Sequence, residues 1–419
     1  GRWWTRSMTT SRRDPLPHRF TRIAWSSVTA QLAEQIALVA VPLAAVLLLG
    51  AGATETALLQ VAQTLPFLVL ALPLGLVVDR TSPHRVLVAS ELLRTVTLGV
   101  IVVLISLDAL TFVALLALGG VGAIGTVGVS VAVPSAVPRL VTSDRLMDAN
   151  RWLELGRSAA FICGPVLAGA LVSAAGADTA LVVATIACAA AVTLLIRLDI
   201  PRSAPVGRAS AWSEAAHGVR YVLTHRLLRP MLVTSTIFNV GWFLIQSVFV
   251  VYALERLGMT AAMVGIAMGA YGAGMVIGAV LSRPLSRRLR FGMMTVLGPI
   301  AGFVSAVLMV GTLWMPTATL AFASFFLFGL GPVLWSISTT SLRQAVTPAP
   351  LIGRVSSLLV VSTYGARPIG AALGVAISVL FGMSWCIVAS VVVFALQLVV
   401  VLFSALPGVR ELPALSDAR

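Results

Sequence analysis

The sequence is 419 residues long, with 58% hydrophobic residues, only 11% charged residues and a mean hydropathy of +1.00. Soluble domains carry about 25% charged residues, so this chain lacks the polar surface that a water-soluble protein needs. Its net charge of +14 comes from arginine alone, because it contains no lysine. In so apolar a chain this charge predicts membrane topology, and no nucleic-acid partner is expected.

Chains that cross lipid must satisfy their backbone hydrogen bonds internally, so they form helices or closed barrels. The apolar runs are about 20 residues or longer, as a membrane-spanning helix requires, whereas barrel strands would alternate over about ten residues. In chain order they predict twelve helices, at 23–49, 57–78, 87–107, 110–137, 152–176, 179–196, 231–253, 261–281, 292–313, 318–342, 355–381 and 385–406. The predicted fold class is therefore an all-α integral membrane protein in a lipid bilayer.

The connections between these runs form two sets with different arginine content. One set, at 50–56, 108, 177–178, 254–260, 314–317 and 382–384, holds a single arginine, Arg256. The other set and the two tails hold 25 arginines. Arginine-rich loops stay on the cytoplasmic side of the membrane by the positive-inside rule. Both termini are therefore predicted in the cytoplasm, in a multi-pass protein of the cytoplasmic (inner) membrane.

The longest connection divides the predicted helices into two sets of six. It contains an amphipathic stretch, Ala211–Thr224, which predicts a helix on the cytoplasmic surface. The predicted parts are an N-terminal tail (1–22), a six-helix bundle (23–196), a linker (197–230), a second six-helix bundle (231–406) and a C-terminal tail (407–419).

The two sets of helices resemble each other at a nearly constant offset. Three features recur 203 or 204 residues apart: Gly75 with Gly278, Arg139 with Arg343, and Gly164-Pro165 with Arg367-Pro368. Many transporters are built by internal duplication of a multi-helix unit, with their site near the bilayer midplane. The repeat therefore predicts twelve transmembrane helices in two pseudo-symmetric six-helix bundles around a central site.

The connection after the second helix resembles a known signature. Its glycine, Asp-Arg pair and following arginine are spaced as in the loop between helices two and three of the major facilitator superfamily: Gly75, Asp79, Arg80 and Arg85. Residues 137–150 and 343–355 are similar to the branch of that superfamily that contains enterobactin exporters and macrolide efflux pumps. The loop differs at Thr81–His84, where the family usually carries an aromatic-Gly-Arg run.

The resemblance implies roles for several charged residues. Asp79 and Arg80 are expected to lock the two halves together in one conformation, with the neighbouring charges Arg85, Glu91 and Arg94 at the cytoplasmic ends of helices two and three. Glu91 and Arg94 are three residues apart and share a helical face. Glu154 and Arg157 have the same spacing and are expected to join this cluster from helix five. The alternative is that these charges only set topology.

A glycine-proline motif in helix five also resembles the exporters of this family. It consists of Gly164, Pro165 and Gly169. Small residues let membrane helices approach closely, and proline lets them bend. The motif is therefore expected to serve the conformational change, although such pairs are common in membrane helices.

Glu34 is the acidic residue inside the first predicted helix. It lies 12 residues beyond Arg22, which at about 1.5 Å per residue places it about 18 Å deep, near the midplane. An ionisable group at this depth costs at least about 3 kcal/mol on insertion scales and normally faces a cavity or a partner. We predict Glu34 as the proton-coupling residue, with a structural acid bonded to a neighbouring hydroxyl or amide as the alternative.

Arg367 lies at a comparable depth in helix eleven, 13 residues beyond Arg354. Its charge is expected to face the central cavity, a carboxylate or helix-end carbonyls, either as a substrate contact or in a structural pair. Other polar and aromatic residues predicted to line the cavity with it, or else to pack between helices, are Gln31, Gln35, Asn239, Trp242, Gln246, Tyr271 and Tyr364.

These features predict a secondary transporter that exports a drug-like or siderophore-like small molecule by proton antiport. Such a monomer would need no metal or cofactor beyond the proton gradient. An importer or a lysolipid flippase on the same fold is the alternative.

An integral membrane enzyme or a transport-inactive sensor is the alternative from another functional class, but neither the tails nor the linker carries a set of residues that could form a catalytic site. No lysine is present for a phosphate-binding loop, which excludes ATP-driven transport within this chain.

Overall fold

The computed structural model describes residues 17–142, 145–196, 198, 219–348 and 352–410. Within them the chain forms long helices, one short 3-10 helix η1 (Val137–Arg139) and no strand. The long helices are α1 (His18–Leu49), α2 (Ala53–Arg80), α3 (Pro83–Ser106), α4 (Phe112–Ala136), α5 (Leu146–Ala175), α6 (Ala177–Ile196), α8 (Leu228–Glu255), α9 (Ala261–Arg288), α10 (Phe291–Gly311), α11 (Ala318–Val346), α12 (Ile352–Phe381) and α13 (Met383–Leu402). The expectation of an all-α chain is confirmed.

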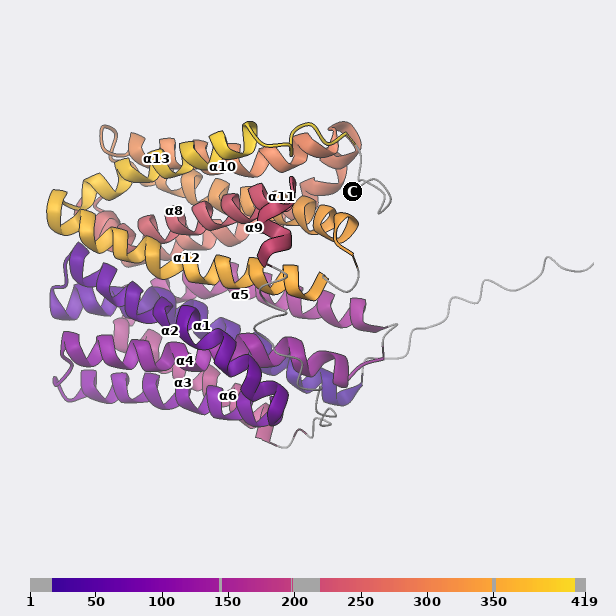
Figure 1. The fold of residues 1–419 in the computed structure, drawn as a ribbon. Coiled ribbons are helices and arrows are strands. Elements are labelled where there is room, and N and C mark those ends of the chain that lie inside the picture. The colour runs from indigo at the N-terminus through magenta and orange to yellow at the C-terminus, as the bar shows by residue number, and fades with distance from the viewer. Residues whose placement is uncertain (1–16, 143–144, 197, 199–218, 349–351, 411–419) are drawn as a thin grey trace, which may run out of the picture.

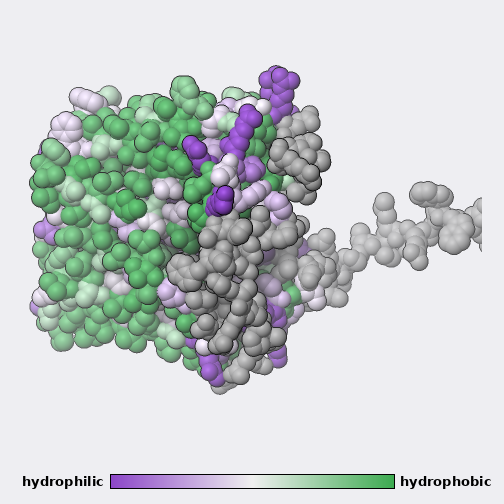
Figure 2. Space-filling view, viewed as in Figure 1, coloured by the Kyte–Doolittle hydropathy of each residue, from purple (hydrophilic) through white to green (hydrophobic). Residues whose placement is uncertain are grey.

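Eleven of these helices, counted over the described residues, are long and apolar enough to cross a membrane. That count leaves out the remaining long helix, α2, several of whose side chains lie outside the described part. This helix also carries Gln60, Gln63 and Thr64, which line the cavity described below. Figure 2 shows the apolar surface that such a set produces, with hydrophobic residues over the flank of the helices and hydrophilic residues toward one end. The molecule therefore presents its helix sides to lipid.

The helix contacts repeat between the two halves of the chain (Figure 1). In the first half, α1 packs on α5 and α6, α3 packs on α4 and α6, and α2 packs on α4. In the second half, the helices in the corresponding positions form the same pairs: α8 with α12 and α13, α10 with α11 and α13, and α9 with α11. The main contacts between halves, α5 with α9 and α2 with α12, are also equivalent to each other. This pattern is what internal duplication of a six-helix unit produces.

The helices extend beyond the predicted apolar runs, mainly at the end of the molecule that carries most arginines. There, α5 begins six residues earlier than predicted, at Leu146, and α9 continues seven residues further, to Arg288. Hydropathy locates only the part of a helix inside the hydrocarbon, so polar turns at the ends were missed. Of the predicted surface helix, residues 211–218 lie outside the described residues, and 219–224 are helical.

The connections at the opposite end are short and turn sharply. Gly50, which ends α1, has φ +65°, and Gly382, between α12 and α13, has φ +91°. Residues with a Cβ rarely adopt such angles, so glycine permits these tight turns. The main packing in the first half is instead between helices that are mostly not sequential, α1 with α5 and α6, and α2 with α4, and the middle parts of α1, α2, α3 and α4 enclose one space.

Candidate functional site

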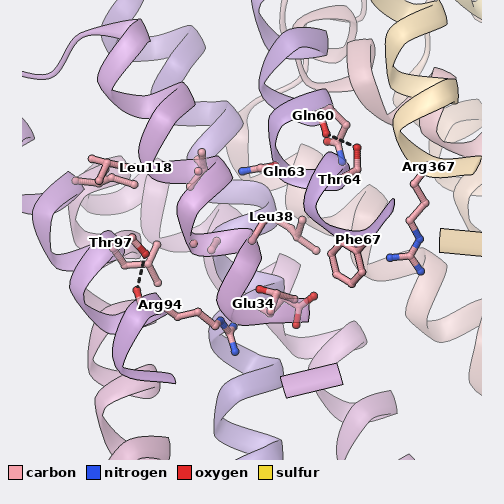
Figure 3. Close-up of a pocket in the computed structure, with 18 of the residues that line it drawn as sticks. Glu34, Leu38, Gln60, Gln63, Thr64, Phe67, Arg94, Thr97, Leu118 and Arg367 are labelled. Carbon is pink, nitrogen blue, oxygen red and sulfur yellow. Dashed lines mark hydrogen bonds between the residues drawn. The ribbon is translucent and has the colours of Figure 1, made fainter. Parts of the chain in front are cut away.

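A cavity lies among α1, α2, α3 and α4, and α8 and α12 of the other half each add one residue to its wall (Figure 3). It contains about 820 Å³ that protein atoms do not fill, open solvent at its mouth included. Among the described residues, three charged side chains line it: Glu34 from α1, Arg94 from α3 and Arg367 from α12. The cavity thus combines one acid and two bases inside an otherwise largely apolar wall.

Glu34 is half-buried and forms no ion pair in the described part of the chain. It lies between the two arginines in Figure 3, and its charge acts on both Arg94 and Arg367. The helix around it is apolar, and α1 reaches this depth as a continuous helix of 32 residues. Glu34 is therefore a carboxylate that faces the cavity and has no fixed partner.

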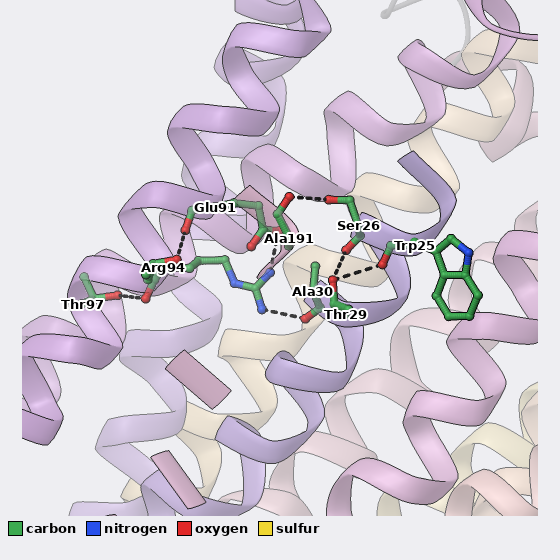
Figure 4. Close-up of polar contacts among 9 residues, drawn as sticks. Trp25, Ser26, Thr29, Ala30, Glu91, Arg94, Thr97 and Ala191 are labelled. Carbon is green, nitrogen blue, oxygen red and sulfur yellow. Dashed lines mark hydrogen bonds and ion pairs between the residues drawn. The ribbon is translucent and has the colours of Figure 1, made fainter. Parts of the chain in front are cut away.

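Arg94 is almost fully buried and held in place by two helices (Figure 4). Its Nη1 donates to Oε1 of Glu91 at 2.9 Å, and its Nη2 donates to the carbonyl oxygen of Ala30 on α1 at 3.0 Å. Gly125 on α4 makes room for the arginine stem, since a Cβ there would lie 2.7 Å from Cγ of Arg94. Glu91 and Arg94, which share a helical face as their spacing indicated, form an ion pair in the structure.

The location expected for this pair needs correction. We expected it at the cytoplasmic helix ends, but Arg94 lies 11 residues past the start of α3 at Pro83, about 16 Å along the helix, and lines the cavity. Pairing neutralises the two charges, which allows them to lie this deep. Arg85 lies near the start of α3 and is exposed.

Arg367 is surrounded by aromatic rings rather than by carboxylates. Its Cζ lies 4.1 Å from the ring centroid of Tyr364, 5.4 Å from that of Phe67 on α2 and 5.3 Å from that of Phe243 on α8. Phe67 and Tyr364 are themselves stacked, with centroids 5.0 Å apart. Cation–π contacts stabilise a guanidinium through its faces and leave its edges free to donate hydrogen bonds. Arg367 thus joins the two halves beside the cavity without an ion pair among the described residues.

The other predicted cavity residues do not line this space. Trp242 is buried in an aromatic cluster of the second half, where it stacks on Tyr271 with centroids 4.7 Å apart. Gln35 is buried against Gly164, and the Asn239 amide donates to the Ser235 carbonyl one turn earlier. Gln31 and Gln246 are half-buried on α1 and α8 and lie outside the cavity lining. Of the eight predicted residues, Arg367 lines the cavity, and Tyr364 stacks on Phe67, which also lines it.

The helix-five motif lies at two close helix contacts. Gly164 faces the Cβ of Gln35 on α1 so closely that a Cβ on the glycine would clash. Gly169 faces Gly265 on α9, and a Cβ on Gly169 would lie 2.9 Å from Cα of Gly265. The carbonyl oxygen of Pro165 lies where a Cβ on Gly265 would clash with it. The motif therefore permits close packing both inside the first half and across to the second.

The expected gating cluster is only partly described. Gly75, Asp79 and Arg80 lie in the last turns of α2, and two residues separate α2 from the start of α3. The side chains of Asp79 and Arg80 lie outside the described part, so their gating role stays a prediction. Glu154 and Arg157 form a bidentate ion pair, with oxygen–nitrogen distances of 2.6 and 3.0 Å, on an exposed face of α5.

Sequence reasoning missed the polar stripe of α2. Gln60, Gln63, Thr64 and Phe67 all line the cavity. Their spacing is i, i+3, i+4 and i+7, which places them on one helical face. That spacing was present in the sequence and would have identified α2 as a cavity helix.

The comparisons with known proteins agree with this architecture. The family model described as Major Facilitator Superfamily matches residues 23–371, so the chain belongs to that family. It is a multi-pass membrane transporter rather than an enzyme. The chain is 26% identical over 246 residues to the enterobactin exporter EntS of Salmonella choleraesuis, covering 58% of this chain and 57% of the relative.

Solved structures show the same fold at low sequence identity. A bacterial homologue of the iron transporter ferroportin in an inward-facing state has a TM-score of 0.73 and 17% identity, over 92% of this chain and 98% of that one. A POT family transporter in complex with 5-aminolevulinic acid has a TM-score of 0.75 and 12% identity, over 94% and 97%.

Proposed function

We propose that this protein is a proton-coupled exporter of a small molecule in the bacterial cytoplasmic membrane, with both termini in the cytoplasm. The observation that carries the proposal is Glu34, a half-buried carboxylate without an ion pair among the described residues, in a largely apolar cavity near the middle of α1. Ionisable groups at this depth mark ion and substrate pathways. The similarity to enterobactin exporters supports outward transport. The proposal takes the monomer as the transporting unit.

Coupling requires that proton binding and substrate binding influence each other at this cavity. Antiport results when proton and substrate exclude each other. The protein then changes between its two conformations with either the proton or the substrate bound, but not both. A substrate that donates hydrogen bonds to Glu34, or carries positive charge near it, has this effect. Gln60, Gln63 and Thr64 can orient such a molecule along α2. No metal or cofactor takes part, and the proton gradient supplies the energy.

Arg367 favours a second candidate, in which the chain imports an anion. An anion held at the free edge of this guanidinium would bind better when Glu34 is protonated, because the two negative charges would otherwise repel each other. Proton and substrate would then cross together. The sign of the proton movement on substrate binding therefore distinguishes the exporter (release) from the importer (uptake).

Transport by the purified protein in liposomes tests the proposal. With the vesicle lumen more acidic than the outside, and the arginine-rich ends outside, we expect an exported probe to accumulate inside until a protonophore collapses the gradient. Enterobactin is the probe suggested by the relatives, and ethidium serves as the aromatic cation. Probe accumulation that is the same with and without the pH gradient would contradict proton coupling. Accumulation only when the vesicle lumen is more alkaline than the outside would indicate the importer.

A further inference from the structure

One buried carboxylate, Glu91, takes no part in the mechanism above. It lies on α3, only 1% exposed, with Oε1 bound to Arg94. Its other oxygen, Oε2, is also buried and accepts no hydrogen bond from the described residues. Buried carboxylates normally have both oxygens satisfied, so a half-satisfied one is unusual. Glu91 therefore holds its arginine with one oxygen, and the Cys188 thiol of α6 lies beside the carboxylate.

Arg94 connects Glu91 to the predicted proton site. Its Nη2 binds the carbonyl oxygen of Ala30, and Glu34 lies four residues after Ala30, one turn further along α1. The arginine also lines the cavity that contains Glu34. In Figure 4 the guanidinium extends from α3 toward α1, with Glu91 on one side. Arg94 is thus the shared neighbour of a buried carboxylate and a cavity carboxylate.

Arg94 binds Glu91 directly, and its charge also acts on Glu34 across the cavity without a hydrogen bond between them. Charge on Glu91 neutralises Arg94 and weakens its attraction for a charged Glu34, which makes Glu34 easier to protonate. The other titratable groups that face this network are Arg367, opposite Glu34 on α12, and the Cys188 thiol of α6, which faces Glu91 and Arg94. Neither provides a second negative charge at neutral pH, so Glu91 is the counter-charge that decides how strongly Arg94 acts on Glu34.

We propose that Glu91 is a positioning residue that sets the proton affinity of Glu34 through Arg94. The inference rests on the proposed function, in which Glu34 carries the coupled proton. Glu91 holds the guanidinium against α3 and the Ala30 carbonyl and thereby limits how strongly Arg94 attracts the charged form of Glu34. Without Glu91, the full charge of Arg94 acts on Glu34 and keeps it ionised.

Infrared titration of the purified protein in lipid nanodiscs tests this inference with the proton itself as the probe. The carbonyl stretch that disappears in Glu34→Gln reports the protonation of Glu34. We expect Glu91→Gln to shift the midpoint of this band to lower pH by about one unit, a tenfold fall in proton affinity. The double variant Glu91→Gln/Arg94→Gln removes both charges and should reverse that shift. The proton-driven transport rate should follow the same two shifts.

Glu154→Gln is the matched control. Glu154 forms an i,i+3 pair with Arg157 of the same kind, but on an exposed face of α5. The Glu154→Gln substitution should leave the pH midpoint of the Glu34 band unchanged, even if it alters the transport rate. A midpoint unchanged in Glu91→Gln, or a shift that the double variant does not reverse, would overturn the inference. A wild-type protein without any Glu34-dependent band would instead overturn the proposed function.

Discussion

Replacing Glu34 with glutamine is expected to reduce proton-driven transport to the background level of empty liposomes. Glutamine keeps the size and hydrogen-bonding capacity of the side chain but cannot bind and release a proton at this position. Substrate binding should weaken without being abolished, because glutamine resembles the protonated Glu34 that disfavours the substrate, while the other groups of the cavity, including Arg367 and the α2 stripe, are unchanged. Initial rates under an imposed pH gradient, compared with exchange of labelled for unlabelled probe without a gradient, separate the two effects.

The matched control for this substitution is Gln35→Asn. Gln35 is the next residue on α1 but is buried against Gly164 rather than in the cavity. Its shortening should affect packing and leave the pH dependence of transport intact. If Glu34→Gln transported with the wild-type response to the pH gradient, Glu34 would be a structural acid and another group would carry the proton.

Replacing Arg94 with glutamine is expected to destabilise the fold more than other arginine substitutions in this chain. The change removes the counter-ion of Glu91 and leaves that carboxylate buried without a charged partner. Breaking a buried ion pair from one side costs about 3–5 kcal/mol. The same substitution at the exposed Arg157–Glu154 pair should cost about 1 kcal/mol or less. Thermal unfolding in detergent measures both.

The double variant Glu91→Gln/Arg94→Gln provides the thermodynamic cycle. It replaces the pair by two neutral amides, so most of the stability lost in Arg94→Gln should return. Equal unfolding temperatures for Arg94→Gln and Arg157→Gln would show that the buried pair does not stabilise the junction of α3 with α1.

The helical fold and the acid of the cavity were predictable because both depend on local signals. Runs of about 20 apolar residues form helices in lipid. The uneven distribution of arginine predicts which connections are cytoplasmic, and that orientation stays a prediction. Glu34 stood out because an acid in an apolar run has no other inexpensive location. The internal repeat likewise followed from spacing alone, and the helix contacts repeat accordingly.

The surroundings of the two deep arginines were not predictable, because they depend on contacts between distant helices. The rings around Arg367 come from α2, α8 and α12, and no local pattern joins them. Trp242 and Tyr271 looked like cavity residues, since an aromatic residue in an apolar helix has the same signature whether it faces a cavity or another ring. Arg94 was placed too near the surface because hydropathy does not show that Glu91 neutralises it.

The central claim is that Glu34 faces an aqueous cavity between helices and not the lipid. Cysteine labelling tests it most directly, in a background where Cys163, Cys188 and Cys386 are replaced by alanine. Glu34→Cys should react with a charged, water-soluble thiosulfonate reagent, whereas Val96→Cys, on the exposed flank of α3, should react only with a lipid-soluble maleimide. Labelling of Glu34→Cys by the lipid-soluble reagent alone would contradict the account.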